Sequence, residues 1–182
     1  MNGPSIARLP HERLHLQDGP IDLVIEAFGE REEVEAAYRQ AWERFQDILQ
    51  TLVDELAMLR APVGPAYPLV RGPVAKRMVA AVWQHRDVFI TPMAAVAGAV
   101  AEEILEALLA GRRLRKAYVN DGGDIALCLG AGESFRAGVV DDGAFHFCVS
   151  MYFNFCPAVF LITKREAYIF ESSREAVSAR DM

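Results

Sequence analysis

Apolar and polar residues alternate over residues 14–17, which is the pattern of a β-strand with one buried face. Asp18 and Gly19 then favour a tight turn, and the apolar-rich segment 21–28 follows directly. This order predicts an N-terminal β-hairpin.

A helical period replaces the alternation from residue 31 to about residue 59, where apolar residues recur at three- and four-residue steps. Glutamates gather at the start of this segment, where the helix dipole favours negative charge, and Pro62 prevents its continuation. We expect one long amphipathic helix that covers a sheet, followed by an irregular loop over residues 60–72. Pro73 predicts the start of a second helix, which ends near His85.

Strands are predicted after a third helix, at residues 114–119, 125–129 and 135–140. The uncharged segment 147–163 is shorter than the roughly 20 apolar residues of a membrane helix, so we interpret it as paired buried strands. Helices grouped ahead of a run of strands indicate an α+β fold, with a mostly antiparallel sheet packed against long amphipathic helices. The length of 182 residues predicts a single domain, 1–182.

Charge, cysteine content and the N-terminal residues bear on the partners and the cellular location of the protein. A net charge of −6 gives a nucleic-acid backbone little to bind, so we expect no nucleic-acid partner. The three cysteines form no C-x-x-C pair, which favours reduced thiols over a disulfide framework or a zinc ribbon. The first residues lack the apolar run of an export signal, and we therefore expect a cytoplasmic protein with no membrane partner.

The strongest chemical motif is Asn120-Asp121-Gly122-Gly123-Asp124, which lies between two predicted strands. Glycines let backbone amides approach an anion or a flat ring, and the Asn and Asp side chains offer oxygen atoms to a ribose hydroxyl or Mg²⁺. The same residues are also what a tight hairpin turn needs. The carboxylates in excess of that need keep a nucleotide-binding interpretation open.

The third helix, predicted over residues 91–110, offers a second candidate. Thr91 and Pro92 favour its start, and Gly111 its end. Its free amides and the Thr91 hydroxyl could receive a phosphate. Its many alanines are also typical of a helix that packs closely against a sheet, which is the more common reason for small residues on a helix.

A cationic segment, residues 112–116, follows that helix. We expect a solvated turn that complements the helix end, with a phosphate clamp as the alternative. The chain contains neither G-x-x-x-x-G-K nor G-x-G-x-x-G, so the motifs of P-loop and Rossmann nucleotide sites are missing.

Three blocks, residues 90–104, 116–127 and 132–135, carry a family resemblance. They resemble an uncharacterised bacterial and archaeal family related to the ApbE flavin transferases, over about residues 9–140. The resemblance implies an ApbE-like fold. The ApbE transferases cleave FAD and attach FMN through its phosphate to a threonine of a target protein, with Mg²⁺ stabilising the phosphoryl charge.

The resemblance implies roles for the same motif residues. Asn120, Gly122, Gly123 and Asp124 would line a flavin-nucleotide site, with Asp121 and Thr91 nearby and Asp124 as a ligand of Mg²⁺. It also implies a protein substrate and a homodimer. No catalytic residue can be named from the sequence.

The sequence departs from that family in two segments. The transferases carry a lysine at the start of the comparable helix, whereas residues 94–99 contain no cation to stabilise a phosphoryl group. Residues 144–182 match nothing in the family. We interpret this tail either as the product of a frame change or truncation, or as ordinary buried strands in a divergent member.

Two functions are therefore expected as alternatives. The first is a flavin-nucleotide (FAD or FMN) binding protein with Mg²⁺-dependent FMN transferase-like activity. The second is a non-catalytic ligand-binding or oligomeric structural protein of the same fold. A small-molecule nucleotide is the expected partner of the first.

Overall fold

The structure is a computed structural model that describes residues 3–141, 144–152, 160–163 and 167–170, with side chains up to residue 135. Its main element is a six-stranded sheet in which every neighbouring pair of strands is antiparallel. In sheet order the strands are β1 (Ser5–Arg8), β2 (Leu14–Asp18), β3 (Ile21–Gly29), β4 (Leu114–Asp121), β5 (Asp124–Leu129) and β8 (Phe160–Thr163).

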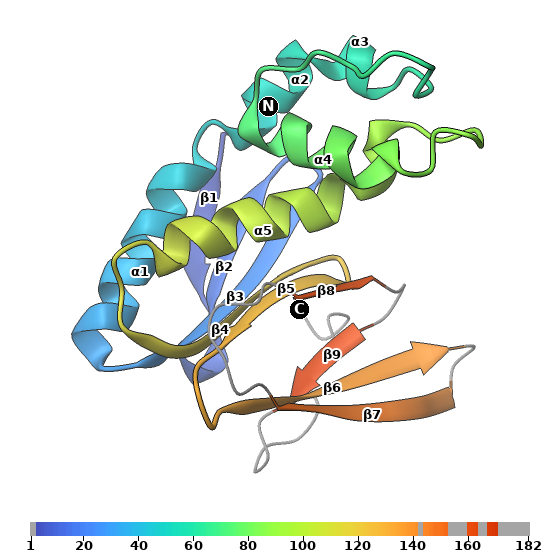
Figure 1. Ribbon diagram of the computed structural model, residues 1–182. Coiled ribbons are helices and arrows are strands. Elements are labelled where there is room, and N and C mark those ends of the chain that lie inside the picture. Colours follow the sequence, from blue (N-terminus) through green and yellow to red (C-terminus); the bar gives the residue numbers. More distant parts are fainter. Residues whose placement is uncertain (1–2, 142–143, 153–159, 164–166, 171–182) are drawn as a thin grey trace.

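Helices α1 (Arg31–Phe45) and α5 (Val96–Leu109) cover one face of this sheet (Figure 1). The other helices are α2 (Ile48–Asp54), α3 (Leu56–Leu59) and α4 (Pro73–Trp83), with short 3-10 helices η1 (Pro10–Glu12) and η2 (Pro92–Ala95). Inward residues of β2 to β5 and apolar residues of the helices form one continuous core, in which Leu23, Phe45 and Ile104 are almost fully buried. Burial of this apolar surface is the main force that holds helices and sheet together.

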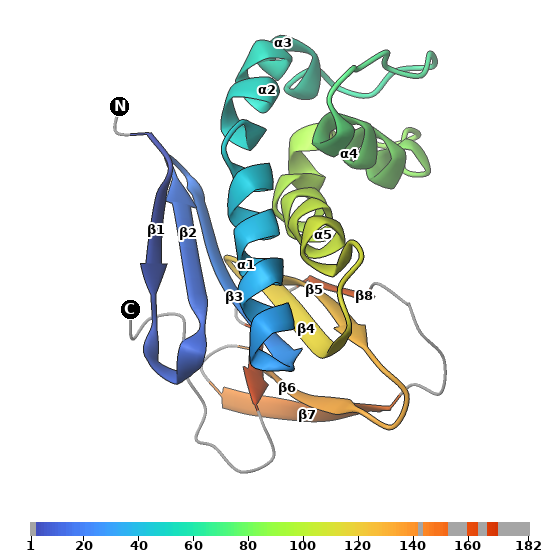
Figure 2. The ribbon, with the colours of Figure 1, turned by 90° about the vertical axis from the view of Figure 1, so that its left-hand side faces the viewer.

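A second, three-stranded antiparallel sheet lies on the other side of the main sheet (Figure 2). Its order is β7 (Ala144–Tyr152), β6 (Ser134–Asp141), β9 (Ala167–Phe170). Phe135 at the start of β6 packs edge-on against Tyr118 and Phe28 of the main sheet, with ring centroids 5.7 and 5.9 Å apart. The six-stranded main sheet therefore has an apolar cluster on each face.

The predicted hairpin and strands are confirmed, with β2 and β3 joined at Asp18 and the later strands close to their expected bounds. The mixed helix and antiparallel-sheet class is confirmed as well. Strand β1 was not predicted, because its four residues are all exposed and show no alternation. Of the segment 147–163, the described parts form strands, but β7 pairs with β6 and β8 pairs with β5. Residues 153–159 lie outside the described residues.

The single helix expected over residues 31–59 is wrong, because the chain forms α1, α2 and α3 there. The chain leaves the helical conformation at Asp47 and Glu55. These breaks let Ile48 and Leu59 remain fully buried.

Candidate functional site

The double-glycine turn joins β4 to β5. Gly122 and Gly123 have φ angles of 58° and 106°, in the left-handed region that favours glycine. The Asn120 side-chain oxygen accepts a hydrogen bond of 2.9 Å from the Gly123 amide. A two-residue hairpin with positive φ at both positions requires this chemistry, so the glycines and Asn120 have a structural use.

Asp124 connects this turn to the start of α5. Its half-buried carboxylate accepts a hydrogen bond from the backbone N–H of Gly98, in the first turn of that helix. Burial raises the pKa of Asp124, and the Gly98 hydrogen bond opposes the increase. The two candidates of the sequence analysis, the turn and the helix, therefore meet at one carboxylate.

Asp121 is the register partner of Asp124 across the turn, so both side chains lie on the helix-covered face of the sheet. Asp121 is only 8% exposed, and it accepts a hydrogen bond from the backbone N–H of Asp22. Burial raises the pKa of Asp121 to about 7, and the negative charges of Asp124 and Asp22 add to the increase. A cation placed between the two carboxylates would relieve this repulsion.

The paired carboxylates of Asp121 and Asp124 are the oxygen atoms of this turn that could contact a cation. Mg²⁺ is commonly held by one or two carboxylates, together with water and substrate phosphates. Among the described residues, no group of three or more His, Cys, Asp or Glu side chains is placed to hold a metal ion. Asp121 and Asp124 would thus supply oxygen ligands, and the phosphates would supply the others.

Thr91 lies farther from the start of α5 than the sequence predicted. It precedes η2, and α5 begins at Val96, whose N–H is bonded to the Met93 carbonyl. The Thr91 hydroxyl makes no capping hydrogen bond. The helix expected to open at Thr91 starts as a 3-10 helix because Thr91 and Pro92 initiate only that tighter turn. Among the described residues, no hydrogen bond joins Thr91 to the double-glycine turn.

The cationic segment is not the uniformly solvated turn that was expected. Lys116 is 8% exposed, and its ammonium lies 4.7 Å from the ring centres of Phe28 and Phe135 while donating to the Ser134 carbonyl. Its position in β4 directs it between the two sheets. Arg113, by contrast, is exposed and forms a long ion pair of 3.9 Å with Glu33.

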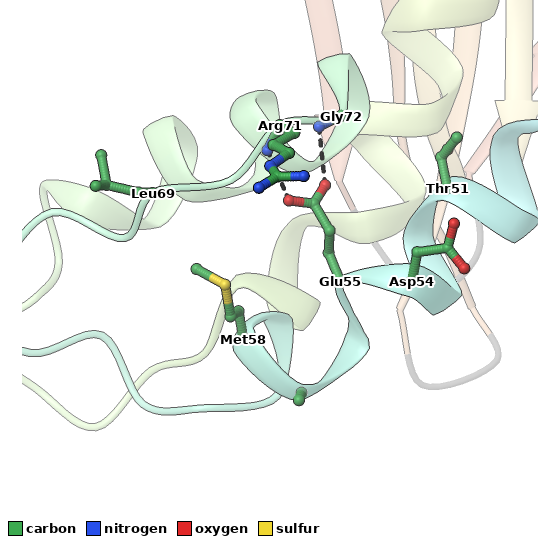
Figure 3. A pocket seen from close by; sticks show the side chains of 8 residues that line it. Thr51, Asp54, Glu55, Met58, Leu69, Arg71 and Gly72 are labelled. Carbon is green, nitrogen blue, oxygen red and sulfur yellow. Dashed lines mark hydrogen bonds between the residues drawn. The ribbon is translucent and has the colours of Figure 1, made fainter.

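Two pockets are lined by described residues, and neither includes residues 120–124. The larger, of about 570 Å³, lies beside α2 and α3 (Figure 3). In it the Glu55 carboxylate accepts hydrogen bonds of 2.6 and 2.8 Å from the backbone N–H groups of Arg71 and Gly72, just before α4. Sequence reasoning missed Glu55, because a glutamate inside a helical period has no distinguishing mark.

The smaller pocket, of about 460 Å³, borders η1. His11 and Glu12 on its rim have φ angles of 64° and 61°, which are unusual for residues other than glycine. The Tyr38 hydroxyl donates to the Glu12 carbonyl and accepts from the Ala27 amide, so it fixes this turn. Burial raises the pKa of Tyr38 to about 12.

The fold and site define an α+β protein with helices on one face of an antiparallel sheet. The β4–β5 hairpin, called here the acidic hairpin because it carries Asp121 and Asp124, contacts the start of α5 through Asp124. The chain matches the family described as AbpE bacteria over residues 6–152, and it belongs to that family. This match extends past residue 140 into the tail that was expected to match no family. The comparison with curated proteins finds no match. None of the described helices is both long and apolar enough to cross a membrane.

Proposed function

We propose that this protein binds a flavin nucleotide, FAD or FMN, together with Mg²⁺ at the acidic hairpin. The observation that carries the proposal is the placement of Asp121 and Asp124 side by side, with Asp124 bonded to the Gly98 amide. The resemblance of residues 116–127 to relatives of the ApbE flavin transferases supports the choice of a flavin. FMN transfer to a protein substrate in the cytoplasm is the finer form of this proposal.

A role without catalysis is the second candidate, and one feature favours it. Residues 94–99 contain no cationic side chain, whereas phosphoryl transfer depends on positive charge beside the phosphates. A protein with this helix start would hold a nucleotide more readily than it would cleave one.

The test is titration of the purified protein with FAD and with FMN, in the presence and absence of Mg²⁺, with calorimetry to measure binding. A separate assay measures whether FMN is released from FAD. Asp124→Asn keeps an oxygen that can accept from Gly98 but removes the charge. We expect this variant to fold normally and to lose at least about tenfold in Mg²⁺-dependent affinity. Glu43→Gln, an exposed carboxylate on α1, is the matched control and should bind as the unmodified protein does.

The outcomes separate the two functions. Binding with release of FMN supports a transferase, and binding without release supports a nucleotide-holding protein. If neither flavin binds with Mg²⁺, or if Asp124→Asn binds as well as Glu43→Gln, the flavin proposal is wrong.

A further inference from the structure

Two loops project from the same end of the molecule, beyond α4 and away from both sheets (Figures 1 and 2). They are residues 60–72, between α3 and α4, and residues 84–91, between α4 and η2. The Val63 amide donates a 2.9 Å hydrogen bond to the Ile90 carbonyl, which joins one loop to the other. Tyr67 and Trp83 pack edge-on at 4.9 Å. The loops therefore form one connected surface, here called the loop end.

The loop end exposes large apolar side chains. Leu69 and Phe89 are 84% and 85% exposed, and Val88 is 64% exposed. These are the most exposed large apolar side chains among the described residues. Single exposed apolar residues are ordinary, but three such exposed side chains on two joined loops indicate an interaction surface.

The charge of this region is opposite to that of the whole chain. The two loops, residues 60–72 and 84–91, contain three arginines against one acidic residue, Asp87, while the chain has a net charge of −6. Arg60, Arg71 and Arg86 on the loops are exposed. Arg86 also lies 4.9 Å from the ring of Trp83. The loop end thus combines exposed apolar side chains with exposed arginines and with the Tyr67–Trp83 aromatic pair.

We propose that the loop end docks on an anionic lipid bilayer surface, with Leu69, Val88 and Phe89 inserted at the interface. Anionic headgroups attract the arginines, and Trp and Tyr rings favour the boundary between headgroups and acyl chains. A symmetric pair of copies meeting through this surface would bring the same arginines together, so charge disfavours a second copy. Attachment of this kind needs no membrane-spanning helix, and it does not depend on the flavin proposal. It departs from the expectation that the protein has no membrane partner.

The test is co-sedimentation of the full chain with vesicles. Vesicles of phosphatidylcholine alone are compared with vesicles of equal phosphatidylcholine and phosphatidylglycerol. We expect binding to the anionic vesicles, at least about tenfold weaker binding to the neutral ones, and weakening by salt. Trp emission should shift to shorter wavelength on binding, because Trp83 lies at the loop end.

Variants identify the surface. The double variant Leu69→Ser, Phe89→Ser should lose at least about tenfold in vesicle binding, and Arg60→Gln, Arg86→Gln should lose a similar amount. Ile6→Ser is the matched control, because Ile6 is 49% exposed on β1 and should not affect binding. Thermal unfolding verifies that each variant is folded.

Three results would overturn the inference. They are no binding to anionic vesicles, equal loss in Ile6→Ser, and unchanged binding in the Leu69 and Phe89 double variant. If vesicles are not bound but the double variant abolishes a concentration-dependent dimer, the loop end is an interface between copies instead. If an acidic protein is bound through the loop end in place of vesicles, the occupant is a protein and the bilayer proposal is wrong.

Discussion

The protonation of Asp121 follows from where its carboxyl group lies. The side chain faces the helix-covered side of the sheet, and burial raises its pKa from the ordinary value of 3.8 to about 7. The folded protein therefore holds a proton on Asp121 at pH values where the unfolded chain has lost it. Stability must then fall as the pH rises from about 4 to about 7, by at most about 1.4 kcal/mol per pH unit.

Asp121→Asn should remove this penalty. We expect the variant to be more stable than the unmodified protein by roughly 1–3 kcal/mol at pH 8 and equal to it near pH 4. Asn retains an oxygen that can accept the Asp22 amide, so the hydrogen bond need not be lost. Urea unfolding at the two pH values measures the difference. A stability difference that does not change with pH would show that folding does not raise the pKa of Asp121.

At the scale of elements, Glu55 explains how α4 is held. The chain leaves the helical conformation at Glu55, between α2 and α3. Its carboxylate then binds the two amides that precede α4, at Arg71 and Gly72 (Figure 3). One side chain thus fixes the loop 60–72 at its end nearest the helix.

Glu55→Ala should destabilise the protein by about 1–2 kcal/mol, because two backbone donors lose a charged acceptor. The neighbouring Asp54→Ala is a suitable control, since Asp54 lies in the same pocket but is exposed and accepts its hydrogen bond from the Gln50 side chain. We expect a change within about 0.5 kcal/mol for that variant. Chemical denaturation of both variants tests the assignment. Equal losses would mean that Glu55 has no special role.

Helices and strands were predictable from the sequence where the local apolar pattern matches the burial in the folded protein. The hairpin from β2 to β3 follows from alternation and a turn at Asp18, and both are local properties. The break near residue 47 was not predictable, because the apolar period continues through it. The break goes with the burial of Ile48 and Leu59 in the core, and burial is a tertiary property.

The candidate site also has one part that the sequence predicts and one part that it does not. The turn at Gly122 and Gly123 follows from residue type, and positive φ confirms the reason for two glycines. The bond from the Gly98 amide to Asp124 joins segments far apart in sequence, so only the folded chain shows it. The burial of Lys116 is likewise set by the second sheet, and a run of cations in the sequence gives no sign of it.

At the scale of the whole molecule, Phe135 connects the two sheets. It is 1% exposed, and its ring contacts Phe28 and Tyr118 on the face of the main sheet opposite the helices. Lys116 covers the same ring. A single aromatic side chain thus helps to cover the apolar cluster that the helices leave uncovered.

Phe135→Ala should therefore cost about 3–5 kcal/mol of unfolding free energy, because it leaves a cavity between the sheets and removes two ring contacts. Phe89→Ala removes an equal ring from a site that is 85% exposed and should change stability by less than about 0.5 kcal/mol. Urea unfolding of the two variants provides the comparison. If Phe135→Ala is as mild as Phe89→Ala, the packing of β6 against the main sheet contributes little to the stability of the fold.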